Sequence, residues 1–113
     1  MKNNLILVNY KLEAAPGLYQ SESTIAYSYD ELMEICESNE ETGFKIISDV
    51  IPLVISGRTY SERKASLEAL AIRISNSEVV DLYYSEEADI FDFFYTNGKR
   101  YGLLTDFREN AII

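Results

Sequence analysis

The chain has 113 residues, of which 47% are hydrophobic and 26% charged, and its formal net charge at pH 7 is -9. These values are close to the averages for globular proteins and the length suits one domain over residues 1–113, which excludes a disordered acidic tail. The longest apolar runs, residues 5–8 and 50–55, are far shorter than the roughly 20 residues of a transmembrane helix, so no membrane segment is expected.

The chain contains no histidine and one cysteine, Cys36. Without histidine, it lacks the most common general base near neutral pH, most types of zinc and iron site, and every triad that depends on imidazole. A single cysteine excludes an internal disulfide, which agrees with a reducing cytoplasm. We therefore expect a cytoplasmic binding protein that is not an enzyme and that uses no metal or cofactor.

Three segments in the first half of the chain predict β-strands. Residues 4–12 change from continuous apolar to alternating, which is typical of a strand that is buried first on both faces and then on one. Residues 14–23 indicate a loop, and residues 24–27 a further short strand. Residues 44–55 are also rich in β-formers, but Pro52 cannot donate to a ladder and so marks an edge, a bulge or a break.

Two helices are predicted from capping boxes, in which a hydroxyl and a glutamate three residues later satisfy free backbone donors. The first box is Ser28 with Glu31, and the second is Thr59 with Glu62, whose helix ends near Asn76. The inner stripe of the first helix is expected to be Leu32, Ile35 and Cys36. The inner stripe of the second is expected to be Leu67, Leu70, Ala71 and Ile74.

The last third of the chain predicts three more strands, over residues 79–84, 90–96 and 99–105. Asn97-Gly98 is a strong two-residue hairpin signal, because a type I′ turn needs positive φ at both central positions. One face of this hairpin, expected in the core, carries Phe91, Phe93, Tyr95 and Leu104. The other face carries Asp92, Phe94, Tyr101 and Leu103.

These elements predict an α+β fold with a mainly antiparallel sheet of about five or six strands. Two helices are expected to pack on the sheet, and the chain is expected to end in the β-hairpin at Asn97-Gly98. No internal repeat or linker interrupts the pattern, which favours a single domain.

The negative charge is concentrated in two sections of the chain. Residues 13–49 contain nine acidic residues against one lysine, and residues 78–92 contain six against none. Direct binding to nucleic acid needs clustered lysine and arginine to replace the counterions on phosphates, and no such cluster is visible. We therefore expect a basic protein as the partner and no direct nucleic-acid binding, because an acidic surface steers association with a basic target.

The candidate partner-binding residues are carboxylates in these two sections and aromatic residues near them. The chain has nine tyrosines, and tyrosine is enriched where an apolar contact must also form hydrogen bonds at a wet interface. The predicted set is Asp30, Glu31, Glu34, Glu37, Glu40, Glu41, Tyr83, Tyr84, Glu86, Glu87, Asp89, Asp92, Phe94 and Tyr101.

The composition favours a protein that inhibits or neutralises a basic, nucleic-acid-handling protein by masking its functional surface. Viral anti-defence proteins such as anti-CRISPR inhibitors, and immunity proteins of nuclease toxins, share this composition, although no motif connects them to the chain. In a sharper version, the acids of the first helix act as a DNA mimic by imitating phosphates, whereas a solvated helix face is the commoner role of such a run. The alternative is a structural or assembly module that forms a homodimer through the C-terminal hairpin face.

One acidic cluster contains carboxylates of the kind that bind Ca²⁺ or Mg²⁺. It lacks the alternating ligands, the central glycine and the closing glutamate of a calcium-binding loop, and a charged connection is usually only solvated. We therefore expect no metal there, and an enzyme that uses carboxylates alone is the third hypothesis. The cluster consists of Glu86, Glu87, Asp89 and Asp92.

Overall fold

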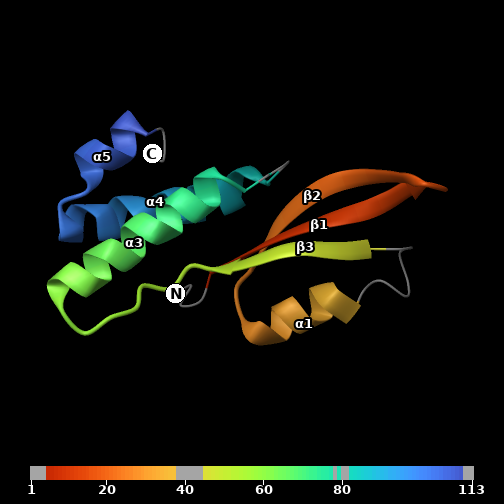
Figure 1. Ribbon diagram of the computed structural model, residues 1–113. Coiled ribbons are helices and arrows are strands. Elements are labelled where there is room, and N and C mark those ends of the chain that lie inside the picture. Colours follow the sequence, from red (N-terminus) through yellow and green to blue (C-terminus); the bar gives the residue numbers. More distant parts are fainter. Residues whose placement is uncertain (1–4, 38–44, 78, 80–81, 111–113) are drawn as a thin grey trace. The chain divides into compact units, whose positions relative to one another are not determined.

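The computed structural model of this chain describes residues 5–37, 45–77, 79 and 82–110. The chain folds into two units (Figure 1). The sheet unit consists of Met1–Leu53 and Glu78–Tyr83, and the helical unit of Val54–Ser77 and Tyr84–Ile113. The single domain expected from the sequence stays a prediction.

The fold class is α+β, but the predicted architecture was wrong. Within the described ranges, the chain has one antiparallel sheet of three strands and four helices. The sequence predicted five or six strands with two helices. The extra strands were expected after residue 78, and the described part of that segment is helical or irregular instead.

The sheet has the strand order β2-β1-β3, with β1 antiparallel to both neighbours. The strands are β1 (Ile6–Ala15), β2 (Leu18–Ala26) and β3 (Lys45–Pro52). The predicted loop over residues 14–23 is therefore wrong. Only Pro16 and Gly17 separate the first two strands, because a proline followed by a glycine at φ 79° closes a tight turn.

The third strand pairs with β1 through an irregular register. Asn9 lies opposite Asp49 and Tyr10 opposite Ile47, so Ser48 is an extra residue on β3. The Ser48 hydroxyl donates a 2.9 Å hydrogen bond to the Asn9 carbonyl oxygen. This arrangement is a β-bulge, which bends a strand at the edge of a sheet.

The position of Pro52 agrees with the prediction made from its missing N–H. Pro52 is the last residue of β3, and it lies opposite Ile6 of β1. In the described sheet β3 is an edge strand. A proline is tolerated there because its nitrogen does not have to donate to a ladder.

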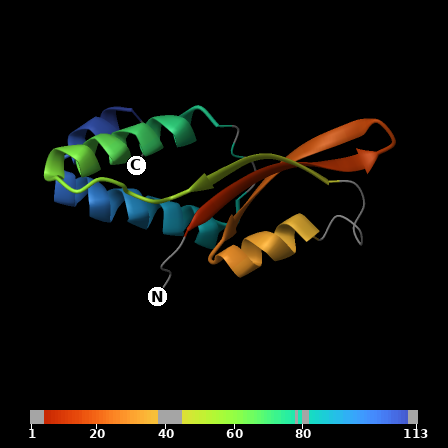
Figure 2. The ribbon, with the colours of Figure 1, turned by 60° about the horizontal axis from the view of Figure 1, so that its bottom comes forward.

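The first predicted helix is confirmed as α1 (Tyr29–Glu37), which runs along one face of the sheet (Figure 2). The Ser28 hydroxyl accepts a hydrogen bond from the Glu31 N–H at 3.1 Å, and the Glu31 carboxylate accepts one from the Tyr27 N–H at 2.7 Å. The inner residues Leu32 and Ile35 pack against the buried side chains of Ile6, Val8 and Ala26.

The second predicted helix is confirmed as α3 (Tyr60–Ser75), which carries both halves of its capping box. The helical unit also contains α4 (Tyr84–Tyr101) and α5 (Leu104–Glu109). The helices α3 and α4 lie side by side in both views (Figures 1 and 2). The core between the three helices consists of Leu67, Leu70, Ala71, Phe94, Tyr101, Leu103 and Phe107.

The predicted C-terminal hairpin does not exist, because Asn97 and Gly98 lie inside α4. The last three buried positions of this helix are four and three residues apart, as a helix facing a core requires. Carboxylates in its first turn and cations in its last turn also suit the helix dipole. The buried residues of α4 are Glu86, Phe94, Gly98 and Tyr101.

Gly98 allows α5 to pack closely on α4. A β-carbon at this position would lie 2.9 Å from two ring atoms of Phe107 and 3.3 Å from a methyl group of Leu104. The chain reverses four residues later, at Gly102, which has φ 70°. The Leu103 N–H donates a 2.8 Å hydrogen bond to the Gly98 carbonyl oxygen, which is the pattern of a Schellman C-cap.

Candidate functional site

Several side chains of the C-terminal segment are buried or exposed in the opposite way to the prediction, whereas Asp92 is exposed as predicted and Phe93 and Leu104 are half-buried. Phe94 and Tyr101, expected on the binding face, have only 1% and 4% of their surface exposed. Phe91 and Tyr95, expected in the core, are 47% and 40% exposed. The helix places Phe94 and Tyr101 inside the helical unit, so neither side chain is on the surface that a partner would meet.

The buried Tyr101 side chain is held by contacts within the helical unit. Its phenol oxygen accepts a 2.7 Å hydrogen bond from the Arg63 Nε, and the Arg63 Nη1 donates to the Ile55 carbonyl oxygen at 3.3 Å. The hydrogen bond from Arg63 lowers the pKa of Tyr101 below its usual value. The ring of Tyr60 lies beside that of Tyr101, with centroids 5.3 Å apart. These contacts join α3, α4 and the segment before α3.

The outer side of α4 carries exposed aromatic side chains. Tyr84, Phe91 and Tyr95 follow the spacing i, i+7, i+11, which places them on one side of a helix. Tyr84 is 88% exposed, and the rings of Phe91 and Tyr95 are stacked with centroids 6.0 Å apart and planes 12° apart. We name these three residues the α4 aromatic face.

Two exposed carboxylates flank the α4 aromatic face. By helical spacing, Glu87 lies on one side of the three aromatic residues and Asp92 on the other. Neither carboxylate forms an ion pair with any lysine or arginine of the described chain. The arrangement offers stacked rings for an apolar or cation–π contact, with a negative charge along each border.

The other two acids of the predicted cluster point elsewhere. Glu86 is buried, and Asp89 is half-buried on the same inward side of α4. The helix therefore divides the cluster into an inner and an outer pair. In the ranges that the structure describes, no group of three or more potential ligands lies close enough to hold a metal ion.

Tyr83 and Tyr84 are both exposed, but the chain does not present them as a strand. Tyr83 precedes α4 and belongs to the sheet unit, whereas Tyr84 is the first residue of α4. The predicted strand over residues 79–84 does not extend through these two residues, because Tyr83 is irregular and Tyr84 is helical. Tyr84 alone contributes to the α4 aromatic face.

The acids predicted on the first helix are brought together only in part. Asp30 and Glu34 are exposed one turn apart on α1, and neither makes an ion pair with a described residue. The Glu31 carboxylate is already used in the helix cap. Glu37 is the last residue of α1 and its side chain is outside the described set, and Glu40 and Glu41 lie outside the described residues.

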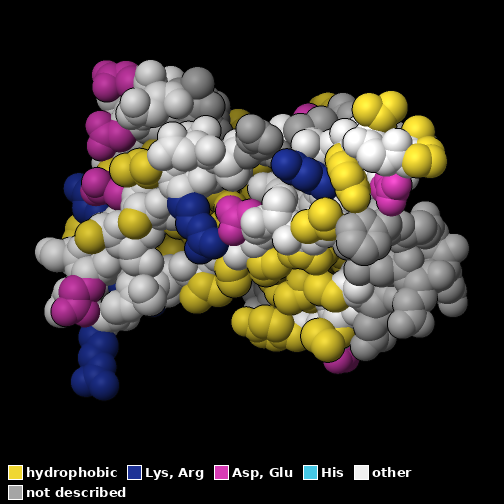
Figure 3. Space-filling model, turned by 45° about the vertical axis from the view of Figure 1, so that its right-hand side comes forward, with side chains coloured by type: hydrophobic (Ala, Val, Ile, Leu, Met, Phe, Trp, Pro, Cys, Tyr) yellow, Lys and Arg dark blue, Asp and Glu magenta, His cyan; other side chains and the backbone are white. Residues whose placement is uncertain are grey.

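Hydrophobic side chains also lie on the surface around α1. Tyr29 and Met33, one turn apart on this helix, are mostly exposed. Figure 3 shows hydrophobic side chains gathered over α1, with few acidic side chains among them. Apolar surface therefore lies beside the described acids of α1.

Sequence reasoning missed the aromatic residues of the outer surface of α4. Phe91 and Tyr95 were assigned to the core because, together with Phe93, they recur at every second residue, which is the strand period. The signal for a helix was also present, since Ile90, Phe94 and Tyr101 recur at helical spacing. Reading that period would have placed Phe91 and Tyr95 outside.

Two further findings bear on what the chain can do. No helix formed by the described residues has the length and the apolar character needed to cross a membrane. Comparison with protein families, curated proteins and solved structures finds no match to this chain.

Proposed function

We propose that this chain is a small acidic binding protein of the cytoplasm that inhibits a basic, nucleic-acid-handling protein by covering its functional surface. The observation that carries the proposal is the α4 aromatic face between Glu87 and Asp92. A surface of this kind combines the side chains that dominate binding energies with charges that select a positive partner.

The aromatic residues supply the contact area. Stacked rings that remain exposed in the free protein bury further apolar surface when a partner covers them. Tyr84 and Tyr95 also carry hydroxyl groups, so they can form hydrogen bonds at the rim of an interface. Phe91, between them in sequence, offers only its ring.

The carboxylates supply the selectivity. Because Glu87 and Asp92 are free of ion pairs within the described chain, their charges are available to arginine and lysine of another protein. Arginine adds to this by stacking on aromatic rings. The net charge of -9 then accelerates the approach of a basic partner, and this steering weakens as salt is added.

Imitation of phosphates by the first helix is a narrower form of the same proposal. Its described support is the pair Asp30 and Glu34, which stand one turn apart and point away from the sheet. The described chain has no C-terminal hairpin that could form the homodimer face, because Asn97 and Gly98 lie inside α4. The residues that would form that face, Phe94, Tyr101 and Leu103, are buried in the helical unit.

The test is capture of a partner from an extract of the source cells on the immobilised full chain. Two variants remove the same amount of charge: Glu87→Gln with Asp92→Asn on α4, and Asp30→Asn with Glu34→Gln on α1. We expect the α4 variant to lose most of the captured protein and the α1 variant to keep it. We expect release of the captured protein by high salt.

The captured protein must also behave as a target of inhibition. The purified target should bind nucleic acid, and the chain should reduce its nucleic-acid binding or its activity in proportion to the amount added. If both charge-matched variants captured equally less protein, the interaction would depend on net charge alone. The role proposed for α4 would then be wrong. A captured protein whose activity does not change would overturn inhibition.

A further inference from the structure

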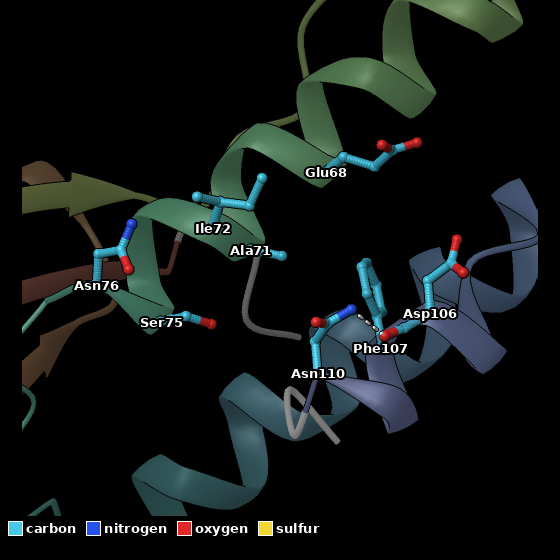
Figure 4. A pocket seen from close by; sticks show the side chains of 8 residues that line it. All are labelled: Glu68, Ala71, Ile72, Ser75, Asn76, Asp106, Phe107 and Asn110. Carbon is cyan, nitrogen blue, oxygen red and sulfur yellow. Dashed lines mark hydrogen bonds between the residues drawn. The ribbon is translucent and has the colours of Figure 1, made fainter.

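A half-open groove of about 420 Å³ lies between α3 and α5 of the helical unit (Figure 4). This volume is within the range of about 300–1,000 Å³ that is usual for ligand pockets. The groove is separate in its residues from the α4 aromatic face. Its lining consists of Glu68, Ala71, Ile72, Ser75, Asn76, Asp106, Phe107 and Asn110.

The polar lining of the groove is rich in acceptors. Glu68 from α3 and Asp106 from α5 bring two carboxylates to the same side of it (Figure 4). Neither is in an ion pair with a described residue, and the lining includes no lysine or arginine. The Asn110 side-chain amide already donates to the Asp106 carbonyl oxygen at 2.8 Å, so that donor is used within the protein.

The remaining lining is apolar and small. Ala71 and Ile72 of α3 and the edge of Phe107 of α5 contribute carbon surface. Ile72 is mostly exposed, although it is a large hydrophobic side chain. A ligand that fits such a groove has an apolar stem and a positively charged head.

We propose that this groove receives an arginine side chain of the basic partner, so the inference rests on the proposed function and adds a second contact to it. A guanidinium group has five N–H donors in a fixed plane and can serve two carboxylates on different helices at once. Its three methylene groups can lie along Ala71 and Ile72. Lysine has a similar stem, but its strongly hydrated ammonium loses more on entering a half-open groove.

The probe for the test is arginine capped at both ends as N-acetyl-arginine methylamide, titrated into the full chain and followed by amide chemical shifts. We expect a saturable shift at amides of Ala71, Ile72, Ser75 and Asn110. Capped citrulline has nearly the same shape without the charge, and we expect no binding of it. Capped lysine should bind at least tenfold more weakly.

The matched variants separate the groove from general charge. Glu68→Gln with Asp106→Asn should abolish the arginine shifts, whereas Asp30→Asn with Glu34→Gln on α1 removes equal charge and should leave them unchanged. Circular dichroism and thermal unfolding check that both variants are folded. Equal binding of capped citrulline or lysine, or equal loss in both variants, would overturn the assignment to arginine.

The two proposals can fail independently. If capped arginine binds in the groove but no inhibited partner is found, the arginine site stands and the proposed function is wrong. If the chain captures and inhibits a partner, and the Glu68→Gln, Asp106→Asn variant captures it equally well, the proposed function stands and the arginine site is wrong.

Discussion

The Nε of Arg63 and the phenol oxygen of Tyr101 are joined by a hydrogen bond of 2.7 Å. It links the first half of α3 to the last residue of α4, and a further bond from Arg63 reaches the Ile55 carbonyl oxygen. A guanidinium donor stabilises the phenolate more than the phenol, which is why the pKa of Tyr101 is lowered.

This bond predicts a pH dependence in the alkaline range. The pKa of Tyr101 is lower in the folded chain than the usual 10.0, so its contribution to stability is complete above pH 10.0 and is lost as pH falls through the folded value. The difference in stability between the native chain and Tyr101→Phe should therefore widen from neutral pH toward pH 10. Urea unfolding at several pH values measures it.

A control accompanies that measurement. Tyr95→Phe removes an exposed phenol on the same helix and controls for the loss of one tyrosine. Absorbance of the tyrosinate should also show that Tyr101→Phe removes a phenol that ionises below the usual 10.0. A constant difference across the pH range would contradict the role given to Arg63.

The capping box of α3 predicts a pH dependence in the acid range. Hydrogen bonds from the N–H groups of Arg58 and Thr59 hold the pKa of Glu62 below 4.5. The stability supplied by the charge is complete above 4.5 and is lost as pH falls through the lowered folded value. Glu62→Gln should therefore destabilise the chain at pH 7 and have little effect in strong acid.

The other half of the same box provides the comparison. The Thr59 hydroxyl accepts a hydrogen bond from the Glu62 N–H at 3.1 Å, and this bond carries no titrating charge. Thr59→Ala should cost about 1 kcal/mol of the free energy of unfolding at either pH. If the costs of both variants followed pH in the same way, the carboxylate would not be the titrating part of the cap.

Close packing at Gly98 predicts that Gly98→Ala destabilises the chain, although alanine is the better helix former. The added β-carbon would collide with the Phe107 ring, and we expect a loss of about 1–3 kcal/mol in chemical unfolding. Phe107→Leu should make room, so the double variant should lose less than the sum of the two single variants. If the losses in the free energy of unfolding were additive, the strain in Gly98→Ala would not come from contact with the Phe107 ring.

The orientation of α4 predicts opposite effects for two neighbouring aromatic positions. Phe94→Ala removes a side chain that is 1% exposed and should cost about 3–5 kcal/mol of the free energy of unfolding. Phe91→Ala, at an exposed position, should cost much less and should weaken capture of the partner. The hairpin prediction requires the reverse order, so unfolding of the two variants in urea decides between them.

Local signals predicted α1 and α3 correctly because each helix begins with its own capping box. The hydroxyls of Ser28 and Thr59 accept hydrogen bonds from the backbone N–H groups of glutamates three residues away. Each stabilising contact is therefore local in the sequence. The edge position of Pro52 was likewise predicted from one missing donor. Such features depend little on the rest of the chain.

The C-terminal third could not be predicted in the same way, because its structure depends on a contact between helices. The residues 90–95 satisfy both the strand and the helix period, and Asn97-Gly98 favoured a turn. Gly98 is needed because Phe107, nine residues later in the sequence, packs against it, and this contact is visible only in the structure. The same error reversed the inner and outer aromatic residues and so displaced the predicted binding surface.

The acidic part of the candidate site was predicted better than the aromatic part. Exposed carboxylates such as Glu87 and Asp92 need no packing partner, so composition alone places them on the surface. An aromatic residue is placed by the helix turn to which it belongs. The groove at Glu68 and Asp106 could not be seen from the sequence, because these acids are 38 positions apart and belong to different helices.

The division of the chain into units has a consequence for dissecting it. Val79, Leu82 and Tyr83 belong to the sheet unit, but segments of the helical unit precede and follow them in the sequence, so the two units alternate along the polypeptide. No single cleavage site, and no stop codon placed between units, releases either one intact. A gene fragment that encodes one unit alone would have to join its two segments directly and omit the part of the chain between them.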